Sequence, residues 1–153
     1  MIYSQKLGLD FFCSSFDIYS LKEIKNISKF NKVPSAMITN IDFLIAVAKQ
    51  KKTTFISTGM CKMTDITRAI KIFKKYKCKF TLMHCVSLYP CPEEELNLSM
   101  IETLKKKFKC DVGYSGHEPT VSPSMFAYML GDSASERHDT LDRFMTVIDQ
   151  AES

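Results

Sequence analysis

Residues 80–85, Phe80-Thr81-Leu82-Met83-His84-Cys85, form a mostly apolar run between two amphipathic segments. The segment before it carries apolar residues at positions 66, 69, 70 and 73, which is helical spacing. The segment after it, residues 97–108, shows a similar pattern with Ile101, Leu104 and Phe108 on one face. A continuous apolar strand between two helices is typical of a parallel sheet that is covered on both faces.

The same alternation extends outward along most of the chain. Strands are expected at residues 10–13, 32–34, 54–57, 80–85, 111–114 and 134–138. Helices are expected after a capping box at Ser20–Glu23, at 41–50 with Asn40 as the N-cap, after Thr64, at 97–108 and at 122–130. About six β-α units predict an α/β fold, and an open doubly wound sheet competes with a (β/α) barrel. No G-x-G-x-x-G follows a strand, which disfavours a dinucleotide site.

The composition is that of a folded protein of about one domain. The chain has 153 residues, of which 45% are hydrophobic and 25% charged, and this excludes disorder. No apolar run approaches the roughly 18 residues of a membrane span, and the first residues lack a signal-peptide pattern. We therefore expect a soluble cytoplasmic protein without membrane partners, whose six cysteines are reduced thiols. The sequence contains no C-x-x-C pair, so the cysteine spacing does not indicate a zinc site.

The net charge of +4 comes largely from two lysine-rich runs, residues 71–79 and 105–109. Both runs fall on the polar sides of expected helices. Nucleic-acid binding needs a clustered basic surface with interleaved aromatic residues, and neither run has that pattern. We expect solvated helix faces and no nucleic-acid partner.

Polar residues concentrate directly after the expected strands. In parallel α/β folds the carboxyl ends of the strands carry the chemistry. Lys32 and Ser35 suit a phosphate, because an ammonium and a hydroxyl near a helix N-terminus bind anions. Further serines at comparable positions along the repeat are Ser14, Ser57, Ser87 and Ser115.

Two histidines end consecutive expected strands. His117 and His138 could reach one metal ion, because neighbouring strands lie roughly 5 Å apart. Glu136 shares a strand face with His138. The alternative is that both histidines are hydrogen-bonded within a core. For His84, inside an apolar strand, the core interpretation is the stronger one.

These polar groups belong to stretches that together resemble a known family. The chain resembles N-acetylneuraminate (sialic acid) synthase and its legionaminic and pseudaminic acid relatives. The matching stretches occur in the family's order and cover nearly the whole chain. They are DFFCSSFD (10–17), KVPSAMITN (32–40), STGM (57–60), HCVSLYP (84–90), VGYSGHE (112–118), ERHDTLDR (136–143) and DQAES (149–153).

The resemblance implies a TIM barrel that condenses phosphoenolpyruvate with N-acetylmannosamine, or a related 2-acetamido sugar, to a nonulosonic acid and phosphate. It implies a divalent metal, Mn²⁺ before Mg²⁺ or Co²⁺, held by His117 and His138. Lys32 and Glu136 would be the catalytic residues, with Glu136 supporting the site. The phosphoenolpyruvate-binding positions would be Lys32, Ser35, Ser57 and Ser115, with Ser14 and Ser87 on two more variable positions.

The chain also departs from the family pattern. Met37 stands where many members have an acidic residue, Asp139 replaces an apolar residue, and Ser15 stands where proline is common. The resemblance implies that two βα units would precede Met1, and that the end of the barrel and an antifreeze-like domain would follow Ser153. Residues 1–153 are therefore expected to be one partial synthase barrel.

Such a barrel would have open sheet edges, so we expect a homo-oligomer or association with a missing N-terminal segment. Two alternatives stay open. One is another phosphoenolpyruvate-dependent synthase, such as one for 3-deoxy-sugar acids. The other is an inactive chain that acts only by association.

Overall fold

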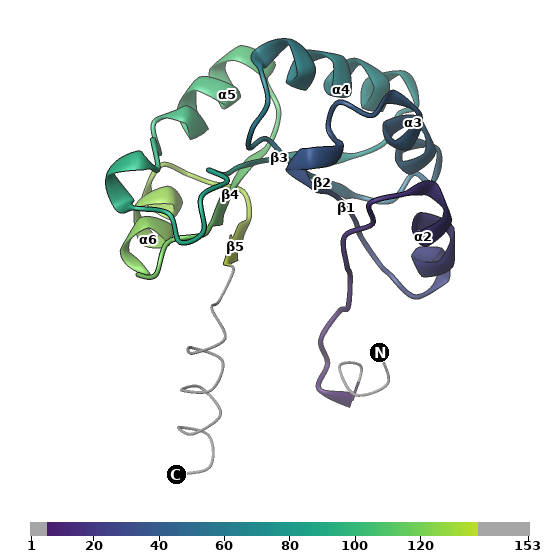
Figure 1. Ribbon diagram of the computed structural model, residues 1–153, viewed down its shortest axis with the longest axis horizontal. Helices are drawn as coiled ribbons and strands as arrows, with labels where there is room; N and C mark the ends of the chain where they lie inside the picture. The colour runs from purple at the N-terminus through teal and green to yellow at the C-terminus, as the bar shows by residue number, and fades with distance from the viewer. Residues whose placement is uncertain (1–5, 138–153) are drawn as a thin grey trace.

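Five parallel strands form one curved sheet in the computed structural model, which describes residues 6–137 (Figure 1). The strands follow one another across the sheet in chain order. A doubly wound sheet reverses its strand order at a switch point, whereas a barrel adds each strand beside the last. The described residues therefore form a half-barrel. Its strands are β1 (Asn31–Val33), β2 (Thr54–Ser57), β3 (Phe80–His84), β4 (Val112–Gly116) and β5 (Ser135–Arg137).

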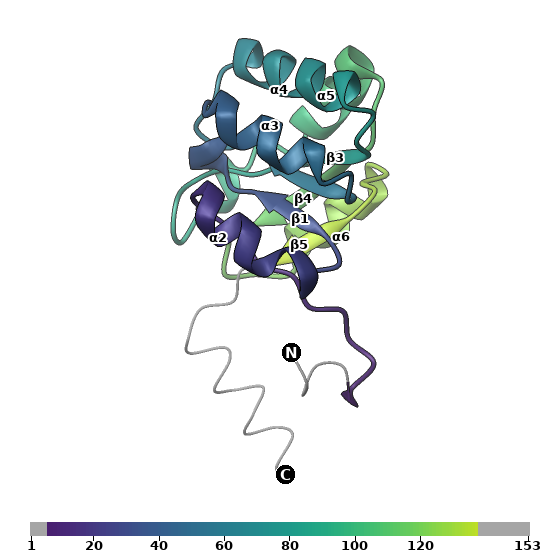
Figure 2. The ribbon, with the colours of Figure 1, turned by 90° about the vertical axis from the view of Figure 1, so that its right-hand side faces the viewer.

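Helices cover the convex side of the sheet. Figures 1 and 2 show α3, α4 and α5 as an outer layer, with α2 and α6 at the two flanks. The α-helices are α2 (Ile18–Glu23), α3 (Ile41–Lys49), α4 (Met63–Lys75), α5 (Met100–Phe108) and α6 (Ser122–Met129), with short 3-10 turns η1 (Ile24–Asn26), η2 (Ser35–Met37) and η3 (Glu93–Glu95). None of these helices is long and apolar enough to cross a lipid bilayer.

The hydrophobic core lies between the sheet and the outer helices. Alternate strand residues such as Ile56 and Leu82 are fully buried in it, beside Phe43 of α3 and Phe73 of α4. Burying a side chain of this size contributes roughly 1.5–3 kcal/mol to folding. Successive residues of a strand point to opposite faces of the sheet. The strand residues that alternate with these core residues therefore face the concave side.

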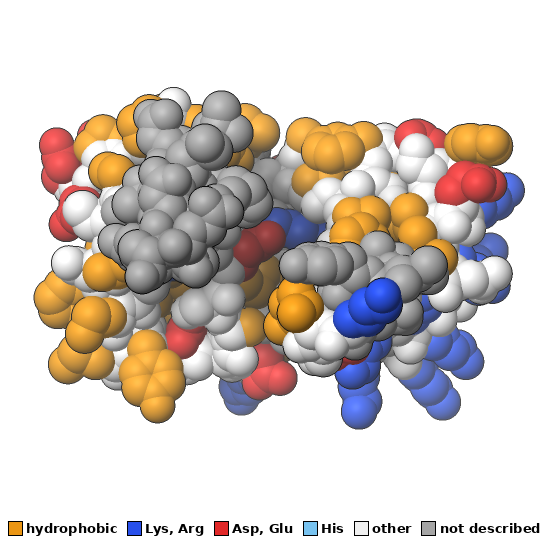
Figure 3. All heavy atoms as spheres, turned by 90° about the horizontal axis from the view of Figure 1, so that it is seen from below, with side chains coloured by type: hydrophobic (Ala, Val, Ile, Leu, Met, Phe, Trp, Pro, Cys, Tyr) orange, Lys and Arg blue, Asp and Glu red, His pale blue; other side chains and the backbone are white. Residues whose placement is uncertain are grey.

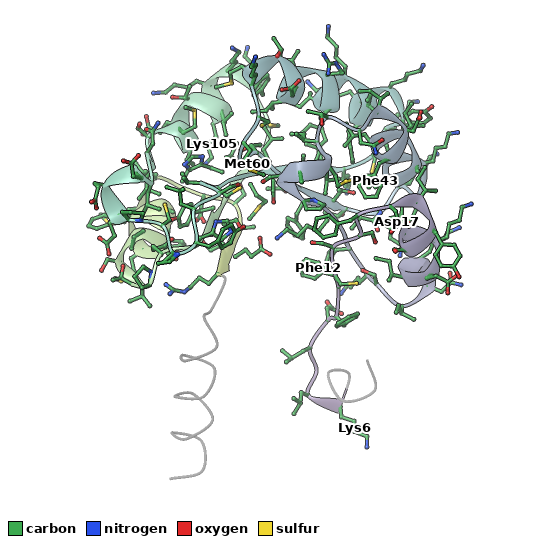
Figure 4. All side chains as sticks on the ribbon, in the orientation of Figure 1. Lys6, Phe12, Asp17, Phe43, Met60 and Lys105 are labelled. Carbon is green, nitrogen blue, oxygen red and sulfur yellow. The ribbon has the colours of Figure 1, made fainter. Side chains whose placement is uncertain are left out.

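The concave face combines an aromatic group with charged and polar residues. Phe12, Phe30 and Phe55 contact one another there, with ring centroids 5.7–5.9 Å apart. Figure 4 shows Phe12 on this concave side and Phe43 on the convex side. Viewed from below, hydrophobic side chains border a hollow in which basic and acidic side chains adjoin (Figure 3).

The structure corrects the number of units. The strand expected at residues 10–13 is absent among the described residues, which contain five strands. A single parallel bridge joins Ser14 to Lys32 at this place. A single bridge provides too few backbone hydrogen bonds to form a strand. The predicted number of about six β-α units is therefore not confirmed. The last strand within residues 6–137 is β5, and position 138, the expected end of that strand, lies outside the described residues.

Two expected helix caps were wrong and one is confirmed. Asp17, not Ser20, caps α2, because its carboxylate accepts the backbone N–H of Ser20 at 2.7 Å. Helix α4 begins before Thr64, and the carboxylate of Asp65 accepts the N–H of Lys62 at 3.0 Å. Asn40 caps α3 as expected, since its side chain accepts the Phe43 N–H at 3.0 Å.

Candidate functional site

A cavity of about 300 Å³ opens at the carboxyl ends of the strands. Its wall includes seven of the residues that the sequence singles out: Ser14, Lys32, Ser35, Ser57, Ser87, Ser115 and His117. They come from segments between residues 14 and 117 that only the parallel topology brings together. The cavity therefore gathers one ammonium, one imidazole and five serine hydroxyls, a set of groups that suits an anionic ligand.

An ion pair lies beside these cavity residues. Lys32 on β1 pairs with Glu136 on β5, and the Lys32 side chain is only 9% exposed. Ser115, beside Glu136 in the β4–β5 register, donates its hydroxyl to the second Glu136 oxygen at 2.8 Å. Glu136 thus balances the buried ammonium and connects it to a serine that lines the cavity.

Ser35 belongs to a second polar cluster on the cavity wall. The backbone N–H of Gly59 lies 3.1 Å from Ser35 Oγ and 3.2 Å from Cys85 Sγ, and these two atoms lie 3.4 Å apart. A Cβ at position 59 would lie 3.0 Å from Ser35 Oγ and would overlap the hydroxyl of Ser87. Glycine at this position therefore allows the hydroxyls of Ser35 and Ser87 to approach the backbone.

His117 is held rigidly at the end of β4. Its ring is 7% exposed, lies against Tyr89 with centroids 4.1 Å apart, and places Nδ1 2.6 Å from the carbonyl oxygen of Val86. A carbonyl only accepts hydrogen bonds, so Nδ1 carries the hydrogen and Nε2 carries the lone pair of the neutral ring. This tautomer, fixed by a backbone carbonyl, is the usual arrangement of a metal-binding histidine.

The other predicted ligand, His138, lies outside the described residues. Within residues 6–137 no group of three His, Cys, Asp or Glu side chains is close enough to hold a metal ion. The described residues thus contain one of the two predicted metal ligands.

His84 is a core histidine, as the sequence indicated. It is 6% exposed, and its Nε2 lies 2.8 Å from the carbonyl oxygen of Leu96. Burial lowers the pKa of His84 below its ordinary value, since desolvation disfavours the imidazolium. Its side chain thus contacts the backbone of the loop after β3.

Three residues of the site were missed by reasoning from the sequence. Gly59, Cys85 and Tyr89 make the contacts described above, but the sequence places them only within strands, polar groups or matching stretches and assigns none of them a role. Their position directly after a strand was the available signal. Met37, for which the resemblance implies an acidic residue in many family members, packs against the hydrophobic core and is not among the residues lining the cavity.

The NeuB family model matches residues 1–153, the full length of the chain. This chain belongs to the NeuB family. The N,N'-diacetyllegionaminic acid synthase of Campylobacter jejuni is 36% identical over 150 residues, which cover 95% of this chain and 45% of that protein. The N-acetylneuraminate-9-phosphate synthase of Homo sapiens is 33% identical, over 92% of this chain and 40% of that protein. This NeuB-family chain thus spans less than half the length of these relatives.

Solved structures agree with this assignment. The chain superposes on a sialic acid synthetase from Leptospira borgpetersenii, crystallised with citrate, with a TM-score of 0.87 and 38% identity over 94% of this chain and 50% of that one. A DAHP synthase from Thermotoga maritima matches with a TM-score of 0.75 at 12% identity, which shows a shared fold alone. The NeuB-family chain therefore has the architecture of one half of such a barrel.

Proposed function

We propose that this NeuB-family chain forms the phosphoenolpyruvate-binding part of a synthase that condenses phosphoenolpyruvate with N-acetylmannosamine or a related 2-acetamido sugar. The products are a nonulosonic acid and phosphate. The observation that carries the proposal is the common cavity of Lys32, His117 and the five serines. The names of the relatives, which are synthases of legionaminic acid and N-acetylneuraminate 9-phosphate, support the product class.

The cavity suits the enol phosphate because it combines a buried cation with hydroxyl donors. The Lys32 ammonium has three hydrogens, so it can keep its pairing with Glu136 and still donate to a phosphate oxygen. Hydroxyls of Ser35 and Ser57 line the same wall and can donate to the remaining oxygens. Hydrogen bonds to a charged group in a partly dry site are stronger than neutral ones.

In the proposed reaction, C3 of phosphoenolpyruvate attacks the aldehyde carbon of the sugar and forms the new C–C bond. Water adds to C2, which has become cationic, and cleavage of the C2–O bond then releases phosphate. Lys32 and the serines stabilise the negative charge on the departing phosphate. Glu136 holds the Lys32 ammonium in place during these steps.

We propose that the site holds a divalent metal such as Mn²⁺, with Mg²⁺ or Co²⁺ as further candidates. His117, whose Nδ1 donates to Val86, would supply one imidazole nitrogen, and His138 would supply the second. Imidazole with water and substrate oxygens is a ligand set that Mn²⁺ accepts. Such a metal supplies Lewis-acid polarisation of an aldehyde oxygen.

We also propose that the chain associates with further barrel strands, from a second copy or from an N-terminal segment of the kind that the family resemblance implies. Within residues 6–137, β1 and β5 form the edges of the sheet, and strand edges favour pairing with other chains. Apolar side chains of α6 and its N-terminus are more than half exposed: Val121, Met125, Phe126, Tyr128 and Met129. Sedimentation velocity tests this, and a monodisperse monomer that gains no activity from an added N-terminal segment would contradict it.

A phosphate-release assay tests the reaction. It contains the chain, Mn²⁺, phosphoenolpyruvate and a panel of sugars, with and without the two N-terminal βα units of a relative. Turnover with N-acetylmannosamine or another 2-acetamido sugar supports the proposal. Turnover only with an arabinose- or erythrose-type phosphate would indicate a 3-deoxy-sugar acid synthase, and no turnover by a well-folded sample would indicate an inactive chain.

A further inference from the structure

Three polar groups from three separate segments meet on the cavity wall. They are Ser35 Oγ at the start of η2, the backbone N–H of Gly59 after β2, and Cys85 Sγ after β3. The mutual distances are 3.1–3.4 Å, and Cys85 is only 5% exposed. Ser35 and Cys85 both line the cavity that we propose for phosphoenolpyruvate.

The hydrogen-bonding capacity of Ser35 limits where its proton can point. A hydroxyl has one hydrogen to donate and two lone pairs that accept. The Gly59 N–H occupies one lone pair. Either Ser35 or Cys85 can be the donor in the bond between their side chains. If the thiol donates, both lone pairs of Ser35 Oγ are used and its only hydrogen is directed away from Gly59 and Cys85.

We propose that Cys85 is a positioning residue whose S–H group directs the Ser35 hydroxyl hydrogen toward an anion in the cavity, an inference that rests on the proposed phosphoenolpyruvate site. Without an anion the hydroxyl can donate to the sulfur. An anion beside Ser35 favours the exchanged arrangement, in which the thiol donates and the hydroxyl turns to the ligand. A thiol is a weak donor and a weak acceptor, so the exchange costs little free energy.

The packing around Gly59 supports this role. Its N–H faces both Ser35 and Cys85, and a Cβ at this position would lie 3.0 Å from Ser35 Oγ and 3.1 Å from Cys85 Sγ. The absence of a Cβ at position 59 therefore allows both side chains to approach this N–H together. Cys85 contributes through Ser35 rather than by contact with the reacting carbon atoms.

The first test compares Cys85→Ala, which removes the donor, with Cys85→Ser, which keeps one. Isothermal titration calorimetry measures the binding of phosphoenolpyruvate and of inorganic phosphate to the full chain. We expect Cys85→Ala to weaken binding about three- to tenfold, as loss of one supporting hydrogen bond does, and Cys85→Ser to stay within about twofold of the wild type. Cys85→Val carries the same test if the alanine variant does not fold.

Cys61→Ala is the matched control. Cys61 lies in the loop after β2, and its thiol donates to the Thr58 carbonyl at 2.9 Å. We expect this variant to bind phosphoenolpyruvate like the wild type. If Cys85→Ala binds phosphoenolpyruvate as tightly as the wild type, the inference is overturned and the proposed function stands. The same holds if Cys85→Ala and Cys61→Ala lose affinity for phosphoenolpyruvate equally.

A second measurement does not depend on ligand binding. High-resolution crystal structures of the wild type, Cys85→Ala and Cys85→Ser show the rotamer of Ser35 directly. We expect one Ser35 rotamer in the wild type and in Cys85→Ser, and several in Cys85→Ala. If the wild type binds neither ligand, the proposed function fails, and the role of Cys85 toward an anion fails with it, whatever the rotamers show. Identical Ser35 rotamers in all three proteins would overturn the positioning role.

Discussion

Lys32 and Glu136 form an ion pair although they lie 104 positions apart and on the two outermost strands of the described sheet. In a flat sheet, strands separated by three others would be roughly 19 Å apart. The contact therefore requires the sheet to curve strongly, as a barrel does. It also brings the predicted catalytic residues together on the concave face.

The ion pair predicts strong coupling in a double-mutant cycle. Glu136→Gln leaves the Lys32 ammonium buried without its carboxylate partner, and we expect a loss of about 1–3 kcal/mol in the free energy of unfolding. Lys32→Met should cost less, because it removes the buried charge itself. Urea denaturation measures each variant and the double variant. Single effects that simply add would contradict a direct interaction.

Gly59→Ala should weaken phosphoenolpyruvate binding with little loss of stability. The new methyl group would overlap the Ser87 hydroxyl and crowd Ser35, but both are side-chain atoms that can rotate away. We expect about tenfold weaker binding by calorimetry and a melting temperature within a few degrees of the wild type. Unchanged affinity would mean that these two hydroxyls do not contact the ligand.

Gly113→Ala should have a different effect, on the fold itself. A Cβ at this position would overlap the carbonyl oxygen of Ala134, which is backbone next to β5 and accepts the N–H of Tyr114. Backbone cannot rotate away, so β4 and β5 must separate locally. We expect a loss of several kcal/mol in the free energy of unfolding, in the range of other overpacked sites. A stability equal to that of the wild type would show that the strands adjust freely.

His117→Ala and His138→Ala should each abolish specific Mn²⁺ binding, measured by electron paramagnetic resonance of the free ion. The fold should change little, because His117 lies at the end of a strand rather than in the core. His84→Gln is the matched control, since His84 belongs to the core and its Nε2 contacts the carbonyl of Leu96. Undiminished Mn²⁺ affinity in both alanine variants would remove the metal assignment.

His84 predicts a pH dependence of stability. Burial lowers its pKa in the folded state, so below about pH 6.5 the unfolded chain binds a proton that the folded chain does not. The free energy of unfolding should therefore fall as the pH decreases below about 6.5, until the lowered folded pKa is passed. Denaturation at several pH values measures this slope. His84→Gln should have a shallower slope, and an identical slope would exclude His84 as its source.

The features that depend on neighbours in sequence could be predicted from the sequence. The strand at 54–57 and the Asn40 cap follow from apolar runs and short-range hydrogen bonds. The common location of Lys32, His117 and the serines could also be predicted, because the carboxyl ends of parallel strands meet at one edge. The choice between Asp17 and Ser20 as the N-cap of α2 could not be predicted from the sequence. In the structure Asp17 is the cap, because its carboxylate accepts the backbone N–H of Ser20.

Only the tertiary structure decided which side chains touch. The sequence placed Lys32 and Glu136 in two expected strands, but the curvature of five strands decided that they pair. Likewise, the stretches around Ser35, Gly59 and Cys85 were recognisable in the sequence, whereas their meeting required three strands, joined by two crossovers, to be in register. The physical reason is that periodicity and capping act over a few residues, while contacts between distant strands depend on the twist and packing of the whole sheet.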